Sequence, residues 1–192
     1  MINGKLCLDF DGILADWHKQ TCEHHGVPYV WKTPGPGSID DNFGIPQSKL
    51  WDGVDADFWA SAPKTPDADK IIELVLKYFK LEQISVMTLF PAAYDYPLEK
   101  ITDHLKGKML WLRKHYPELA KRFTVTTVKY FSAGPRLVLI DDTDTNVEAF
   151  YDNGGYGILY PKIWNKREYL RNNAIEILEQ ELKLCQWMIN NR

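Results

Sequence analysis

Five short runs of aliphatic and β-branched residues constrain the fold of this chain more than any other feature of its sequence. The runs cover residues 4–9, 83–89, 122–128, 136–140 and 156–160. Each has the length of a buried strand, and stretches with helical periodicity separate several of them. Strands that alternate with helices are typical of a mainly parallel sheet covered by helices. We therefore predict an α/β fold, a three-layer Rossmann-like domain with a mainly parallel five-stranded sheet.

Helical patterns are expected after Thr65-Pro66, over 102–115, from about Thr145, and over 167–190. Thr65 is a candidate N-cap, because a proline follows it at the first helical position. Thr145 and Glu148 have the spacing of a capping box, and the stop signal Asn153-Gly154-Gly155 ends that helix. The last helix has one apolar face, formed by Leu178, Leu182, Cys185 and Ile189.

Residues 17–64 break the alternation of strands and helices. This stretch contains Trp17, Trp31, Trp51 and Trp59, but its helical periodicity is weak and no strand is clear. We predict a small helical and loop cap, inserted after the first strand and covering its end, on a core formed by residues 1–16 and 65–192. The alternative is an extended loop whose tryptophans only pack on one another. Long structureless loops are uncommon in compact domains, which favours the cap.

Composition limits the classes of partner. The net charge is −3, with acidic and basic residues interspersed, so there is no basic field for duplex nucleic acid. The three cysteines are widely spaced, which argues against a disulfide framework and favours a reducing, cytoplasmic location. No apolar run approaches the roughly 20 residues of a membrane helix. The first strand begins too near Met1 to leave room for a signal peptide.

Two pairs of aspartates follow expected strands that lie far apart in the sequence. Asp9 and Asp11 end the first run, and Asp141 and Asp142 follow the fourth. In open α/β sheets, ligands bind beyond the carboxyl ends of the strands, where these carboxylates are expected to meet. Carboxylates at the ends of buried strands are costly to desolvate, which favours a role such as holding a divalent cation. The structural alternative is a turn aspartate, or acidic residues that favour the next helix dipole.

Asp9 and Asp11 can divide the work of phosphoryl chemistry. One carboxylate can attack phosphorus and the other can move a proton, while Mg²⁺ offsets their repulsion and neutralises substrate oxygens. Gly12 permits the tight turn that follows. Asp141 is the expected direct metal ligand of the second pair. Asp142 is expected to act through water or to orient the site, because adjacent side chains diverge.

Three residues are candidates for binding phosphoryl oxygens. Thr88 ends the second run and carries a hydroxyl donor, and Lys108 and Lys129 are candidate cations. Each also has an ordinary reading, as a strand threonine or as solvated surface lysines.

The remaining histidines and cysteines do not suggest a second metal site. Cys22, His24 and His25 lack the spacing of a tetrahedral zinc site and have no evident fourth ligand. His104 and His115 are expected on or near a helix surface.

The order of these motifs resembles that of the haloacid dehalogenase superfamily of phosphotransferases. The likeness runs from Leu6 to Pro161 and is strongest to the 5'(3')-deoxyribonucleotidase group and related phage and bacterial nucleotidases. It is carried by Asp9-Phe-Asp11-Gly-Ile-Leu-Ala-Asp16-Trp17, Phe58-Trp59, Lys108-Met-Leu-Trp111 and Leu139-Ile-Asp141-Asp142-x-x-x-Asn146, with Thr88 between them.

The resemblance implies a role for each of these residues. Asp9 would form an aspartyl-phosphate, and Asp11 would protonate the leaving oxygen and then activate water. Magnesium would contact Asp9, the backbone carbonyl of Asp11, and Asp141, with Asp142 at the same site. Thr88 and Lys108 would bind phosphoryl oxygens, with Lys129 nearby.

Trp17, Phe58 and Trp59 are candidates for a slot that stacks a nucleobase; packing between cap and core is the alternative for each. We thus expect a cytoplasmic, magnesium-dependent phosphomonoesterase acting on nucleoside monophosphates, with a small phosphorylated substrate as its partner. Alternatives are another small phosphate, a nucleic-acid 3'-phosphate, or a catalytically silent phosphate-binding protein. Trp187 and Met188 of the last helix could pack on the core or on a second copy, as in a homodimer.

Overall fold

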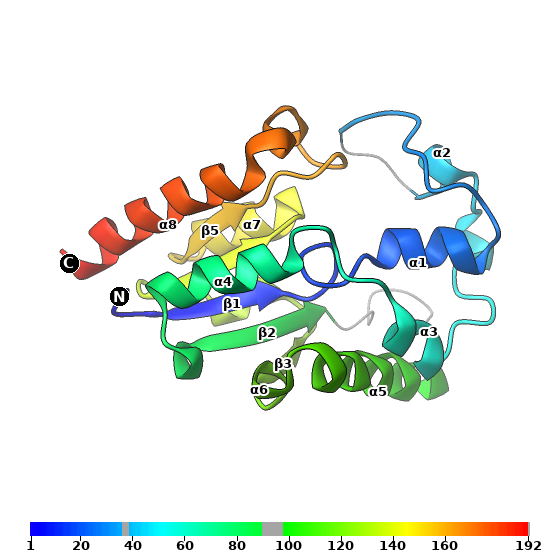
Figure 1. Cartoon of the computed structure of the whole chain (residues 1–192), viewed down its shortest axis with the longest axis horizontal. Coiled ribbons are helices and arrows are strands. Elements are labelled where there is room, and N and C mark those ends of the chain that lie inside the picture. The colour runs from blue at the N-terminus through cyan, green and yellow to red at the C-terminus, as the bar shows by residue number, and fades with distance from the viewer. Residues whose placement is uncertain (36–38, 90–97, 192) are drawn as a thin grey trace.

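The computed structural model describes residues 1–35, 39–89 and 98–191. Its centre is one five-stranded sheet with the strand order β3-β2-β1-β4-β5, and every neighbouring pair is parallel (Figure 1). The strands are β1 Lys5–Asp9, β2 Ile84–Leu89, β3 Phe123–Thr126, β4 Leu137–Asp141 and β5 Tyr156–Leu159. The predicted α/β class and all five strands are confirmed.

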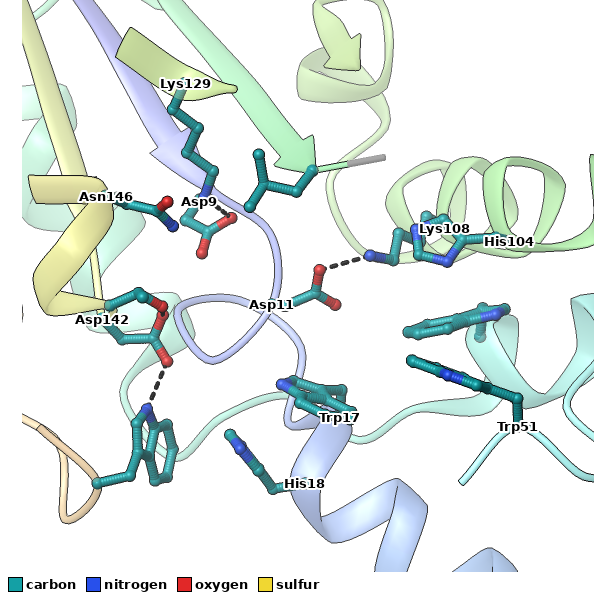
Figure 2. A pocket seen from close by; sticks show the side chains of 14 residues that line it. Asp9, Asp11, Trp17, His18, Trp51, His104, Lys108, Lys129, Asp142 and Asn146 are labelled. Carbon is teal, nitrogen blue, oxygen red and sulfur yellow. Dashed lines mark hydrogen bonds and ion pairs between the residues drawn. The ribbon is translucent and has the colours of Figure 1, made fainter. Parts of the chain in front are cut away.

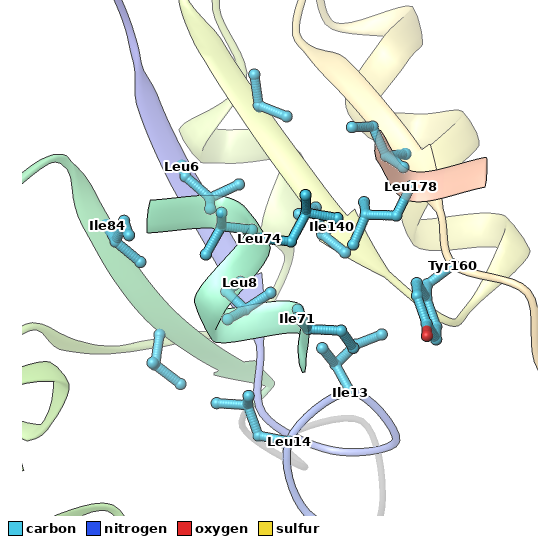
Figure 3. Close-up of a cluster of buried hydrophobic side chains, with 14 of the residues drawn as sticks. Leu6, Leu8, Ile13, Leu14, Ile71, Leu74, Ile84, Ile140, Tyr160 and Leu178 are labelled. Carbon is cyan, nitrogen blue, oxygen red and sulfur yellow. The ribbon is translucent and has the colours of Figure 1, made fainter. Parts of the chain in front are cut away.

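Helices cover both faces of the sheet, which gives three layers. Leu6 and Leu8 of β1 belong to a large apolar cluster with residues of α4 (Ala68–Tyr78) and α8 (Ala174–Asn190) (Figure 3). Cys7 points to the opposite face and packs in a cluster with Phe150 of α7 (Asp144–Asp152). This alternation follows from the two-residue repeat of a strand that is buried on both sides.

The register of the strands places the acidic residues together. Leu8 pairs with Ile140 of β4, so the next residues, Asp9 and Asp141, end neighbouring strands. On the other side, Asp9 pairs with Met87, immediately before Thr88. Since all strands run in the same direction, these side chains reach the same edge of the sheet.

Two expected helix caps are wrong. Asp67 is the N-cap of α4, while the Thr65 hydroxyl donates to the Ile13 carbonyl at 2.6 Å and ties the chain to the turn after β1. Thr143 is the N-cap of α7, and the expected capping box is absent because Glu148 pairs with Lys166 at 2.6 Å. Both side chains bind partners that are distant in the sequence, and local sequence patterns do not reveal such partners.

The other expected helices are present with shifted starts. The helix expected over 102–115 is α5, Leu98–His115, and a short α6, Pro117–Ala120, follows it. In the C-terminal segment, the 3₁₀ helix η4, Glu168–Asn173, precedes α8. Two further 3₁₀ turns are η2, Leu81–Gln83, and η3, Lys129–Ser132. The apolar face predicted for the last helix is buried. None of the described helices combines the length and apolar composition needed to cross a membrane.

The segment 17–64 lies beyond the carboxyl ends of the strands (Figure 1). It contains α1 Trp17–His24, α2 Ile39–Phe43, η1 Gln47–Lys49 and α3 Ala56–Ser61, and residues 36–38 lie outside the described residues. It packs through two small apolar clusters of its own, one around Phe43 and one around Trp59. The division into a cap and a core stays a prediction.

Helix α3 lies directly against α5. The crossing is close because Gly107 has no side chain: a Cβ there would press on the Ala56 carbonyl oxygen and come within 2.5 Å of the Trp59 Cβ. In the next turn of α5, the buried Trp111 indole donates to the Ala62 carbonyl at 2.6 Å. These contacts fix α3 to the helix that carries Lys108.

We expect Gly107→Ala to destabilise the protein, although alanine is normally the better helix former. The added methyl group must push α3 away, and overpacking of this kind costs about 1–3 kcal/mol. Urea unfolding followed by circular dichroism measures the change. Lys106→Ala, at the exposed neighbouring position, should leave the unfolding free energy within about 0.5 kcal/mol of wild type. Equal stability of Gly107→Ala and wild type would show that α3 can move away from α5 without a cost in stability.

Candidate active site

Three buried carboxylates meet at the carboxyl edge of the sheet. Asp9 ends β1, Asp141 ends β4 and Asp142 follows it, and one oxygen from each lies within 4.8 Å of the others. The Asp141 carboxylate also accepts the Thr143 backbone N–H at 2.9 Å and the Asn146 amide at 3.2 Å. The structure thus brings together three of the four aspartates that the sequence analysis assigned to a metal.

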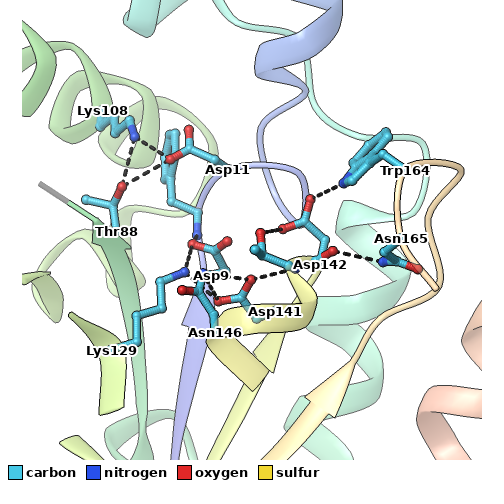
Figure 4. Close-up of polar contacts among 12 residues, drawn as sticks. Asp9, Asp11, Thr88, Lys108, Lys129, Asp141, Asp142, Asn146, Trp164 and Asn165 are labelled. Carbon is cyan, nitrogen blue, oxygen red and sulfur yellow. Dashed lines mark hydrogen bonds and ion pairs between the residues drawn. The ribbon is translucent and has the colours of Figure 1, made fainter. Parts of the chain in front are cut away.

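Lys129 is the cation in contact with this cluster. It is the first residue of η3 and is almost fully buried, and its ammonium lies 2.6 Å from both Asp9 Oδ1 and Asp141 Oδ2 (Figure 4). Burial alone would lower the pKa of Lys129, but the neighbouring Asp141 and Asp9 carboxylates raise it above its usual range. Lys129 is therefore charged and holds two strand ends together.

One ammonium does not balance three carboxylates. Burial, followed by the Asp141 charge, raises the pKa of Asp9 well above its ordinary value. The same two causes raise the pKa of Asp142 to about 7. With all three carboxylates ionised, the cluster would carry more negative charge than Lys129 balances, and a bound cation would relieve it. Its donors are all carboxylate oxygens, the ligand type that Mg²⁺ prefers, so the residues present fit a magnesium ion.

Asp11 belongs to a second, adjoining cluster. The turn that places it depends on Gly12, whose φ of 72° lies in the left-handed region. The Lys108 ammonium pairs with Asp11 Oδ2 and donates to the Thr88 hydroxyl at 2.8 Å, and that hydroxyl donates to Asp11 Oδ2 at 3.1 Å. The other oxygen, Asp11 Oδ1, is buried without a hydrogen-bond partner among the described residues. A hydrogen-bond donor of a bound ligand would fit at this oxygen.

The charge of Asp11 is set by its neighbours. Burial raises its pKa, but the Lys108 and His104 side chains outweigh that effect and lower the pKa below the ordinary value. Lys108 is fully buried in α5, and its ammonium also lies 4.5 Å from the centre of the Trp59 ring. An aromatic face stabilises a cation there, which holds Lys108 at the end of the Asp11 side chain.

A pocket of about 250 Å³ opens between the two clusters (Figure 2). Its charged and polar lining comprises Asp9, Asp11, Lys108, Lys129, Asp142, Thr143 and Asn146. The remaining lining is mainly aromatic: Trp17, His18, Trp51, Trp59, His104 and Trp164, with Leu89. Such a site presents charged groups to a small anion and flat apolar surfaces to whatever is attached to it.

Not every residue assigned from the sequence reaches this pocket. Phe58 is buried beside Trp59 and His24, with ring centres 5.0 and 5.3 Å away, and does not line it, so its assignment to a base-stacking slot is not supported. Thr88 and Asp141 are fully buried behind the residues that line the pocket and act on it through them.

Several lining residues were not expected from the sequence. His104 was expected near a helix surface, which is wrong: it is buried, with its ring 4.3 Å from that of Trp59. The spacing of His104, Lys108 and Trp111 on one helix face could have identified it. His18, Trp51 and Trp164 had no comparable signal, because tertiary packing alone brings them to the pocket.

Comparisons with known proteins provide only distant likenesses. No protein-family model matches the chain, and no curated sequence matches it. Similar solved structures include "a Dehalogenase" (11% identity, TM-score 0.48), whose alignment covers 88% of this chain and 90% of that chain. A "Had-superfamily hydrolase from Ehrlichia chaffeensis" has 13% identity and a TM-score of 0.42, with 93% and 99% covered. A "had family enzyme" from Bacteroides thetaiotaomicron has 16% identity and a TM-score of 0.32, with 88% and 98% covered.

We expect His18 to make the folded state sensitive to acid. Burial lowers the pKa of His18 from 6.5 to about 3, so the folded state keeps the ring neutral while the unfolded chain binds a proton below pH 6.5. Stability from this residue is complete above pH 6.5 and is lost as the pH falls. Between pH 7.5 and 5.0, the unfolding free energy should therefore fall by about 2 kcal/mol less in His18→Phe than in wild type.

Urea titrations at the two pH values measure this difference. Trp31→Phe is the matched control, since it alters a ring packed on His18 without changing a titratable group. It should keep the pH dependence of wild type. The same acid sensitivity in His18→Phe as in wild type would show that His18 is protonated in the folded state.

Proposed function

We propose that the protein is a magnesium-dependent phosphomonoesterase of the haloacid dehalogenase type, acting through an aspartyl-phosphate on Asp9. One observation carries the proposal. A buried carboxylate at the end of β1 is held by Lys129 beside two further carboxylates, and a fourth carboxylate, Asp11, lines the same pocket. The order of these residues along the chain supports it, because it resembles the ordered motifs of that superfamily.

Asp9 is the nucleophile. Its Oδ1 accepts the Phe10 backbone N–H at 2.8 Å and contacts Lys129, so Oδ2 is the oxygen left to attack. In the first step, a P–O bond forms to Asp9 Oδ2 and the ester P–O bond breaks, while Asp11 gives a proton to the leaving oxygen. In the second step, Asp11 takes a proton from water, whose oxygen bonds to phosphorus as the acyl-phosphate P–O bond breaks. Phosphate and free Asp9 result.

Asp11 must be protonated for the first step, although Lys108 lowers its pKa. A phosphoryl group offers Lys108 a competing anion within the same pocket. When the Lys108 ammonium turns to phosphoryl oxygens, burial without that partner favours the neutral form of Asp11. Thr88, behind the pocket, is hydrogen-bonded to both side chains and keeps Asp11 and Lys108 next to each other. Binding of the substrate and protonation of Asp11 are thereby linked.

A magnesium ion bound by Asp9, Asp141 and Asp142, with the Asp11 carbonyl, supplies charge neutralisation for the phosphoryl oxygens and for the crowded carboxylates. Lys129 holds Asp9 and Asp141 next to each other through two ion pairs made within the protein.

We propose a nucleoside monophosphate as the substrate. The leaving oxygen must lie beside Asp11, and the surfaces of the pocket beyond the charged residues are aromatic, including Trp17, Trp51 and Trp59. A flat base matches such walls by stacking. We further propose a cytoplasmic location, with neither a membrane nor duplex nucleic acid as partner. A homodimer through α8 stays a proposal, which Trp187 supports because its side chain is exposed there.

Asp9→Asn should abolish phosphate release from an aryl phosphate in the presence of Mg²⁺. Loss of the nucleophile should lower kcat at least about a thousandfold, and Asp11→Asn should lower it about 10²–10⁴-fold. Phosphate assays on purified protein measure both. Asp152→Asn, an exposed aspartate at the end of α7, is the control and should match wild type. Turnover by Asp9→Asn at the wild-type rate would remove Asp9 as nucleophile.

Trp17→Ala should lower the activity on nucleotides more than the activity on phosphates without a ring. Loss of stacking is worth about 1–3 kcal/mol, so kcat/KM for nucleoside monophosphates should fall about 5- to 150-fold. For glycerol phosphate, which has no ring, kcat/KM should stay near the wild-type value. The control is Trp187→Ala, on an exposed surface. If sugar phosphates or 3'-phosphorylated oligonucleotides are the better substrates of wild type, the nucleotide assignment fails while the phosphatase assignment stands.

A further inference from the structure

The loop after β5 reaches back to the acidic cluster. Trp164 donates its indole N–H to Asp142 Oδ2 at 2.7 Å, and the next residue, Asn165, donates to the Asp142 backbone carbonyl at 2.9 Å (Figure 4). The loop therefore holds both the side chain and the backbone of one of the three clustered carboxylates. None of the chemical steps described above uses Trp164.

Asn165 makes this loop rigid. It is fully buried, and its amide group also donates to the Tyr160 carbonyl at 2.8 Å. Its carbonyl oxygen accepts the backbone N–H groups of Lys162 and Arg167 at 3.3 and 3.0 Å. A buried side chain with all its hydrogen-bonding groups engaged fixes the surrounding backbone. Trp164, the neighbour of Asn165, is thus presented from a fixed position.

The Trp164 ring is held as firmly as its backbone. It stacks on Trp31, with ring centres 5.2 Å apart and planes inclined by 25°, and its centre lies 4.4 Å from that of His18. Both partners belong to the 17–64 segment, whereas Trp164 follows the last strand. The direction of the indole N–H is therefore set by packing against two rings and not by the hydrogen bond alone.

Gly12 also confines the Asp142 carboxylate. Gly12 approaches it so closely that a Cβ there would collide with Oδ2 and lie 2.6 Å from Cγ. Oδ2 is bound by Trp164, while the contact made by Oδ1 is a long one, 3.5 Å from the Thr143 hydroxyl. The carboxylate is therefore held by one oxygen and offers the other to the cluster.

We propose that Trp164 is a positioning residue for the metal site, because its indole N–H fixes the Asp142 carboxylate in the orientation that faces Asp9 and Asp141. The inference rests on the proposed metal site but not on the proposed reaction. A charge-assisted hydrogen bond to a ligand group orients that group before the ion arrives, and loss of such a partner typically lowers metal affinity 10- to 100-fold.

Isothermal titration of the metal-free full chain with Mg²⁺ alone, at pH 7.5 and without substrate, tests the proposal. Trp164→Phe keeps an aromatic ring but removes the donor, and its Kd should rise 10- to 100-fold. Trp187→Phe, which makes the same change on an exposed helix face, should keep the wild-type Kd. Equal Kd values for Trp164→Phe and wild type would overturn the proposal, as would absence of Mg²⁺ binding by wild type.

A spectroscopic readout separates positioning from a general loss of folding. The chain has seven tryptophans, so its ¹⁵N spectrum contains seven indole signals, and the one missing in Trp164→Phe identifies Trp164. In wild type, that signal should shift on Mg²⁺ addition with the Kd from calorimetry, while the Trp187 signal stays in place. A Trp164 signal that does not move at saturating Mg²⁺ would overturn the proposal.

Phosphate release is not a readout in either experiment. If wild type binds Mg²⁺ and Trp164→Phe binds it weakly, but no phosphate ester is hydrolysed, the proposed function fails and the inference holds. If phosphate esters are hydrolysed and Trp164→Phe binds Mg²⁺ as wild type does, the reverse is true.

Discussion

The crowding of three buried carboxylates at the carboxyl edge of the sheet is the constraint on which the rest of the site depends. Asp9, Asp141 and Asp142 are buried within reach of one another, and Lys129 is the single ammonium in contact with them in the described part of the chain. Such a cluster persists only if its geometry is imposed from outside, because the carboxylates repel one another. Three parts of the fold impose this geometry: the parallel register of the sheet, η3 through Lys129, and the loop after β5 through Trp164.

The two clusters differ in how their charge is balanced, and the proposed roles of Asp9 and Asp11 depend on that difference. Asp9 shares its lysine with another carboxylate, whereas Asp11 has the Lys108 ammonium to itself and also accepts from Thr88. In the function we propose, the first arrangement leaves room for a cation beside Asp9, the proposed nucleophile. The second places Asp11, the proposed proton carrier, next to a lysine that a phosphate can draw away. The two aspartates stand two residues apart in the sequence, yet burial and neighbours separate their roles.

Sequence alone predicted those parts of the molecule that local pattern determines. The five strands follow from apolar runs, and the meeting of Asp9 with Asp141 follows from parallel topology, since both end strands. Helix caps failed where a side chain had a distant partner, as Thr65 does with Ile13. His104 was placed wrongly for a similar reason: the crossing of α3 and α5 buries it, and no local pattern encodes a crossing. Trp164 was missed because its partner lies 22 residues away and its neighbours are loop residues.

The contact between α3 and α5 at Gly107 also bears on how the pocket selects its occupant. Trp59, His104 and Lys108 all belong to these two helices, and the bond from Trp111 to the Ala62 carbonyl locks the pair together. This wall therefore keeps its shape when the pocket is empty. A molecule that does not fit this wall should then be excluded without any rearrangement of the two helices, and a change in what the pocket accepts would require a different crossing of α3 and α5.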